Sequence, residues 1–139
     1  MCQFHQAAII TRYITRRPKL DASKELKTIL SKLPGSDRVS FENMIDTWYL
    51  KWQDFLAEKT LNPETMRWHF THRRIRSAYR SLKTNMPYLF TYLEYPNLDI
   101  PNTTNSLEGV FSNLKIKLQN HRGLKKDRKI RFINEILAK

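Results

Sequence analysis

The chain has 139 residues, 40% of them hydrophobic and 12% aromatic, which is enough for one modest core but not for two independent domains. Its 25 Lys and Arg against 13 Asp and Glu give a formal charge of +12, which predicts a polyanionic partner, with nucleic acid first and an anionic membrane surface second. No apolar run approaches the ~18 residues of a membrane span, and no basic region precedes a long apolar segment at the N-terminus, so we expect a soluble, unexported protein.

Two further classes are disfavoured by composition. The single cysteine, Cys2, excludes an internal disulfide framework and is typical of a reducing cell interior. The three glycines form neither GxGxxG nor GxxxxGK, so a nucleotide is not an expected ligand.

Helical spacing recurs along the chain and no segment alternates like a strand for long, so the expected fold is mainly α. The first helix covers QFHQAAIITRYIT and ends at Arg16-Arg17-Pro18. Asp21 or Ser23 is expected to cap a second helix, which Pro34-Gly35 ends. A third helix at about 39–59 carries apolar residues three and four apart, which predicts one buried stripe: Phe41, Met44, Ile45, Trp48, Trp52 and Phe55.

The second half of the chain is also expected to be helical. Asn62-Pro63-Glu64 is typical of a helix start and predicts a fourth helix, with Trp68, Ile75, Tyr79 and Leu82 on one face. A short aromatic piece, PYLFTYLEYP, precedes a surface loop at 96–104. Asn105 then starts a helix that Gly123 ends. The last helix should place its cations outward and four apolar residues inward: Ile130, Ile133, Ile136 and Leu137.

Glu108 stands three residues after Asn105 in the stretch PNTTNSLEG, the spacing of a capping box with Asn in place of Ser or Thr. From spacing alone this structural interpretation is favoured over a metal site. One carboxylate cannot hold two catalytic metal ions, and the aspartates of the chain sit in capping, surface or loop contexts.

Two pairs of residues have the spacing of zinc ligands. Cys2 and His5 form a Cys-x-x-His pair, and His69 and His72 form a His-x-x-His pair expected on one helical face. More than sixty positions separate the pairs, without the short loop of a zinc finger. We therefore favour an interfacial or phosphate-facing role for the helical histidines over a zinc site.

Two basic clusters are more informative. One lies at 64–83 and the other at 115–131, and each contains a single acidic residue. Cations of this density beside Trp68 and Phe70 suit contact with a phosphate backbone better than a solvated face, although such contact carries no sequence preference. The expected DNA-binding residues are Arg67, Arg73, Arg74, Arg76, Arg80, Lys115, Lys117, Arg122, Lys125, Lys126 and Arg128.

The segments CQFHQAAIITRYITRRPKL and PNTTNSLEGVFSNLKIKLQNHRGLKKDRK resemble the C-terminal half of a Mutator-like DDE transposase of a prokaryotic insertion sequence. Such enzymes have an RNase H-like core, a Cys-x-x-His motif after the second catalytic aspartate, a helical insertion and a Thr-Asn-x-x-Glu segment with the final acid. Cys2 and His5 match the first motif, and Thr104-Asn105 with Glu108 match the second.

The resemblance implies that residues 1–139 are one C-terminal fragment of the catalytic domain, with most of the central sheet absent. A helical insertion would occupy about 21–96, and about 101–139 would carry the final acid and the basic tail. The first two catalytic aspartates would lie upstream of the Cys-x-x-His motif, so we expect no strand cleavage by this chain alone.

In the complete enzyme, the resemblance implies two Mg²⁺ ions that activate the nucleophile and stabilise the leaving oxygen during DNA strand cleavage and transfer. Glu108 would be a catalytic residue and a metal ligand, His5 would position the DNA backbone near the active site, and Cys2 would be structural. The implied partners are DNA and other transposase chains, including a second copy. The implied location is the nucleoid in a prokaryotic cytoplasm.

Two other interpretations stay open. One is a small, complete, helical nucleic-acid-binding protein without enzymatic activity. The other is a protein-interaction module that uses Trp48, Trp52 and Trp68, although their helical spacing favours a place in the core.

Overall fold

The computed structural model describes residues 2–138, which form two compact units. The first unit extends to Asn102 and the second begins at Thr103. Both are built mainly from helices, which confirms the predicted mainly α class. Within the described residues, no helix combines the length and the apolar character needed to cross a lipid bilayer.

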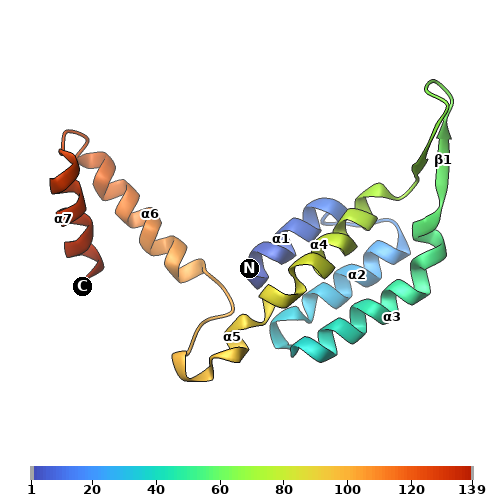
Figure 1. Cartoon of the computed structure of the whole chain (residues 1–139), viewed down its shortest axis with the longest axis horizontal. Helices are drawn as coiled ribbons and strands as arrows, with labels where there is room; N and C mark the ends of the chain where they lie inside the picture. Colours follow the sequence, from blue (N-terminus) through green and yellow to red (C-terminus); the bar gives the residue numbers. More distant parts are fainter. Residues whose placement is uncertain (1, 139) are drawn as a thin grey trace. The chain divides into compact units, whose positions relative to one another are not determined.

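The first unit is a bundle of four helices (Figure 1), packed in a closed ring of neighbours: α1 (Gln3–Ile14), α2 (Asp21–Ser31), α3 (Arg38–Ala57) and α4 (Arg73–Leu89). Helix α1 packs on α2 and α4, and α3 packs on the same two helices, so the ring is closed. The core between them is apolar, because the stripes predicted by helical spacing turn inward. Its largest fully buried side chains include Ile10, Leu26, Phe41, Ile45, Leu82 and Met86.

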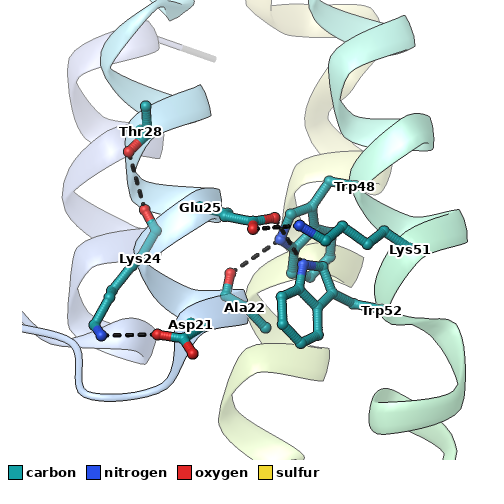
Figure 2. A network of polar contacts seen from close by, with 8 residues as sticks. All are labelled: Asp21, Ala22, Lys24, Glu25, Thr28, Trp48, Lys51 and Trp52. Atoms are coloured by element: carbon teal, nitrogen blue, oxygen red, sulfur yellow. Dashed lines mark hydrogen bonds and ion pairs between the residues drawn. The ribbon is translucent and has the colours of Figure 1, made fainter.

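Polar contacts hold α2 against α3 (Figure 2). The buried indole of Trp48 donates from Nε1 to the carbonyl oxygen of Ala22 at 2.9 Å. Glu25 accepts from Lys51 at 2.5 Å and from the Trp52 indole at 2.8 Å. The Lys51 hydrogen bond, followed by that of Trp52, holds the pKa of Glu25 below its usual value. These bonds fix the facing surfaces of the two helices in one register.

The helices α2 and α3 begin in different ways. Asp21 is the first helical residue of α2 rather than its cap, because Leu20 takes the extended cap conformation and Asp21 instead pairs with Lys24 at 2.8 Å. The predicted cap at Asp21 or Ser23 is therefore wrong. Helix α2 ends at Ser31, and the short helix η1 (Leu33–Gly35) follows it. Asp37 caps α3 by accepting from the backbone N–H of Ser40 at 2.9 Å.

The largest departure from the prediction is a β-hairpin in place of the first turns of the fourth helix. Strand β1 (Lys59–Asn62) pairs antiparallel with β2 (Arg67–Phe70), and the hairpin projects beyond the helices of its unit (Figure 1). Asn62 does accept from the backbone N–H groups of the next residues, at 2.9 Å from Glu64, as a helix cap would. The chain then leaves helical geometry at Met66, whose φ is 51°, and the β-prone residues on either side pair instead.

A buried amide network joins α1 to α4 and to the end of the first unit. Gln6 donates to the Ser81 hydroxyl at 3.1 Å and accepts from Asn85 at 3.0 Å. Gln3 donates to the carbonyl of Leu89 at 3.1 Å. Asn102 accepts from the backbone N–H of Gln3 at 3.3 Å and donates to the Gln3 side chain at 3.2 Å. Two short helices, α5 (Thr91–Glu94) and η2 (Pro96–Leu98), lead from α4 to this junction.

The second unit is a helical hairpin of α6 (Asn105–Asn120) and α7 (Lys126–Leu137). Thr104, not Asn105, occupies the cap position of α6, so the predicted cap is one residue too late. His121 meets Phe132 edge to face at 5.3 Å between ring centroids. Leu114 is the one buried hydrophobic among the described residues of this unit. Ile133 and Ile136 are half-buried as expected, whereas Ile130 and Leu137 are exposed and were wrongly predicted to face inward.

Candidate nucleic-acid interface

A cationic groove lies at the end of the first unit where α1 ends and α4 begins. Its volume is about 700 Å³, and it is lined by the end of α1, the turn after it, the hairpin and the first turn of α4. The cations in the lining are Arg17, Lys19, Arg73 and Arg74, with His69 and His72 beside them, and none of the described residues that line the groove is Asp or Glu. A groove with one sign of charge concentrates counter-ions of the other sign. The groove is therefore suited to a polyanion.

The start of α4 strengthens this positive potential. The first turn of a helix has N–H groups without helical partners and a partial positive charge, so acidic side chains are usually favourable there. Helix α4 has no acidic residue in its first turn and begins with Arg73 and Arg74. Its cap residue, His72, makes no side-chain cap bond to these N–H groups. In an isolated helix, each cation at this position would destabilise the helix by about 0.3–1 kcal/mol, because it faces the positive end of the helix dipole. A bound anion at the same position would instead be stabilised by that dipole.

Backbone strain occurs in the same groove. Thr15, which follows α1 and lines the groove, has φ 71° and ψ 163°. This conformation is nearly exclusive to glycine, and it costs other residues about 1–3 kcal/mol. A strained backbone conformation of this kind is kept only where the packing of the neighbouring residues enforces it. Here the chain path places Arg17 and Lys19 opposite the start of α4.

The base of the hairpin is fixed to the helices by aromatic and charged contacts. The Arg76 guanidinium lies over the Phe70 ring at 3.5 Å from its centroid and donates to the carbonyl of Leu56 at 2.6 Å. His72 stacks on Phe55 with centroids 3.6 Å apart, and its Nε2 is 2.8 Å from a carboxylate oxygen of Glu58. The hairpin therefore has a defined direction relative to the groove.

The cations of the first basic cluster have different roles. Lys83 pairs with Asp46 at 2.9 Å and with Glu42 at 3.2 Å. The hydrogen bond to Asp46 is the main cause of the raised pKa of Lys83. Arg76 holds the hairpin, and Arg74 donates to the carbonyl of Arg12 while it lines the groove. Within residues 2–138, Arg67, Arg73 and Arg80 make no ion pair and are exposed on the hairpin and α4.

The second cluster lies on the helical hairpin of the second unit. Lys115 and Lys117 are on α6, Arg122 is in the turn, and Lys125, Lys126 and Arg128 are at the start of α7; all six are exposed. The second unit thus presents its cations to solvent over both helices and the turn between them.

The two residue pairs with the spacing of zinc ligands lie in different kinds of secondary structure. His69 lies on β2 and His72 caps α4, so the expectation that they share one helical face is wrong. Cys2 caps α1 and His5 lies in its first turn. No group of three or more His, Cys, Asp or Glu side chains within residues 2–138 is arranged to hold a metal ion.

Glu108 lies in the first turn of α6, where its carboxylate accepts from the Thr104 hydroxyl at 2.7 Å and its backbone N–H donates to the Thr104 carbonyl at 2.9 Å. Thr104 and Glu108 are four residues apart, and the cap side chain makes no hydrogen bond to a backbone N–H of the helix, so the capping box predicted for Asn105 and Glu108 is wrong. A pair of Mg²⁺ ions needs several carboxylates, and the described residues alone do not supply such a group.

Sequence reasoning missed the groove itself. Two of its four cations, Arg17 and Lys19, belong to the run RRPK after the first helix, outside both predicted clusters. The closely spaced cations of that run could have indicated a binding site, but only the fold brings them opposite α4. Comparison with protein-family models, curated proteins and solved structures found no match.

Proposed function

We propose that this chain binds the phosphate backbone of DNA, with the groove between α1 and α4 as the principal contact in the first unit and the basic helical hairpin as a second contact. The observation that carries the proposal is the groove lining, which has four cations and no carboxylate. Phosphate oxygens are the anions that an extended row of Arg and Lys side chains binds best, and the interaction is independent of base sequence.

We further propose that the chain is the DNA-contacting part of a Mutator-like DDE transposase, with an RNase H-like origin. In support, the segments that carry the resemblance meet within the first unit, where Asn102 of PNTTNSLEG is hydrogen-bonded to Gln3 of CQFHQ. In the proposed enzyme Glu108 contributes one metal-binding carboxylate, His5 lies near the DNA backbone, and the remaining carboxylates come from outside the described residues. Terminal inverted repeats beside the coding sequence would support this origin.

The second candidate is a helical nucleic-acid-binding protein without enzymatic ancestry. The closed ring of four helices favours it, because the first unit has a core of its own. Both candidates share the groove. An encoded strand with aspartates just upstream of the chain would favour the transposase.

The binding test is fluorescence anisotropy of a labelled duplex of about 20 base pairs between about 50 and 200 mM salt. If the four groove cations each neutralise one phosphate, the slope of log K against log salt is about −3.6, and the affinity falls about 100-fold over this range. The basic helical hairpin makes the slope steeper.

Two double variants with the same net charge separate the groove from general attraction. Lys19→Gln with Arg73→Gln should make the slope shallower by about 1.8. Lys32→Gln with Arg38→Gln removes two exposed cations where α2 ends and α3 begins, away from the groove lining, and should leave most of the affinity intact. Equal losses in the two variants, or a wild-type affinity that does not respond to salt, would contradict the proposal.

A further inference from the structure

The two faces of the β1–β2 hairpin differ in chemistry. Because side chains alternate along a strand, Trp68 and Phe70 share one face of β2, and their partners across the ladder, Leu61 and Lys59, share it too. The opposite face carries Asn62 and His69, which line the groove, together with Thr60 and Arg67. Both faces of the hairpin therefore reach the groove, the polar face through Asn62 and His69 and the aromatic face through Phe70.

The aromatic face is uncovered near its tip. Trp68 is 67% exposed, and Met66 in the turn is 71% exposed. Trp48 and Trp52, by contrast, are buried and half-buried on α3, so the predicted core location is confirmed for Trp48 and wrong for Trp68. An exposed tryptophan in a fixed position is a large contact surface that loses little side-chain entropy on binding.

Charge around this face identifies the kind of partner. The Phe70 ring has the Arg76 guanidinium at 3.5 Å and the Lys59 ammonium at 5.4 Å from its centroid. The acids nearby in sequence are Glu58, which contacts His72, and Glu64 in the turn. An aromatic surface among cations is the combination that binds single-stranded nucleic acid, since bases stack on the ring while phosphates contact the cations.

The hairpin is also rigid enough to hold a stacking surface. The hydroxyls of Thr60 and Thr71 are 2.7 Å apart across the ladder, and the N–H of Thr71 donates to the Glu58 carbonyl at 2.9 Å. Asn62 closes the turn through the N–H groups of Glu64 and Thr65. Trp68 is therefore held on the same face of the hairpin as Phe70, which lines the groove.

We propose that Trp68 stacks on an unpaired base of the nucleic acid whose backbone occupies the groove; this inference rests on the proposed DNA binding. In an intact duplex both faces of an internal base are covered by its neighbours, so the ring has no base face to contact. The proposal predicts that the protein prefers single-stranded or locally unpaired DNA over duplex of the same length, and that this preference depends on Trp68.

The experiment compares wild type, Trp68→Ala and Trp68→Phe on a labelled oligo(dT) of about 16 nucleotides and on a duplex of the same length. Trp68→Ala should weaken oligo(dT) binding by about 5- to 100-fold, the effect of losing one stacked base, and duplex binding by less than about twofold. Trp68→Phe should recover part of the loss. Oligo(dT) should also quench the tryptophan fluorescence of wild type more than that of Trp68→Phe, whose remaining indoles are on α3.

Each outcome decides one of the two proposals. Equal affinity of Trp68→Ala and wild type for oligo(dT), or equal losses on both DNAs, overturns the stacking proposal and leaves backbone binding in place. Binding of neither DNA by wild type overturns the proposed function itself. Because the Trp68 ring is mostly exposed, the variant should keep the fold, and Trp48 emission with circular dichroism checks this.

Discussion

Replacing Thr15 with glycine should stabilise the first unit, although glycine ordinarily destabilises proteins. Thr15 has φ 71° and ψ 163°, which costs a residue with a side chain about 1–3 kcal/mol. Glycine adopts this conformation freely but loses about 0.5–1 kcal/mol more conformational entropy on folding. The Thr15 side chain is exposed, so little burial is lost. The difference predicts a gain of about 0–2.5 kcal/mol in the free energy of unfolding, with about 1 kcal/mol as the central value.

The assay is urea unfolding followed by tryptophan emission, because all three tryptophans belong to the first unit. With a slope of about 1–3 kcal/mol/M, a gain of about 1 kcal/mol raises the midpoint by about 0.3–1 M. Ala8→Gly, in the middle of α1, is the matched control and should lower the free energy of unfolding by about 1 kcal/mol. A Thr15→Gly midpoint that falls with that of Ala8→Gly would refute the strain argument.

Three further predictions concern the contacts within the first unit. Because the pKa of Glu25 is lowered in the folded state, its carboxylate stabilises the fold above the usual pKa of 4.5, and that contribution is lost as the pH falls through the lowered value. Glu25→Gln should weaken the fold slightly at neutral pH and flatten the acid limb of a stability-against-pH curve; an unchanged curve would contradict this. Trp48→Phe removes the indole bond that the Ala22 carbonyl accepts besides its helical bond, and it shrinks a buried side chain, so it should cost about 2–3 kcal/mol in urea unfolding; a loss below about 1 kcal/mol would show that the indole bond contributes little. Arg76→Ala removes the contacts to Phe70 and α3 and should speed amide exchange in the hairpin while the helical core stays protected; uniform exchange changes would mean that the hairpin and helices unfold together.

Helical periodicity predicted most of the first unit. Phe41, Ile45 and Trp48 are buried because their spacing of three and four places them on one side of α3. The error at residues 62–72 has a local cause. Asn62 makes the same backbone hydrogen bonds in a turn as in a helix cap, so the motif does not decide whether a helix or a strand comes next.

The candidate site was less accessible from sequence. The counts of Lys and Arg indicated a polyanion, but the groove joins Arg17 and Lys19 to Arg73 and Arg74 across more than fifty residues. That proximity depends on the packing of α1 against α4, which buried glutamines help to define. Local patterns also could not separate Lys83, neutralised by Asp46 and Glu42, from the exposed arginines of the same helix.

The hydrogen bonds between Gln3 and Asn102 affect where the first unit could be inserted in another protein. These bonds hold the two ends of a segment of about a hundred residues next to each other. A segment whose ends nearly coincide can be placed in a surface loop of an unrelated host protein without stretching the host, because its entry and exit need only the width of that loop. The first unit therefore has the geometry of a segment that can be inserted into a loop of another protein, and the cationic groove would be inserted with it.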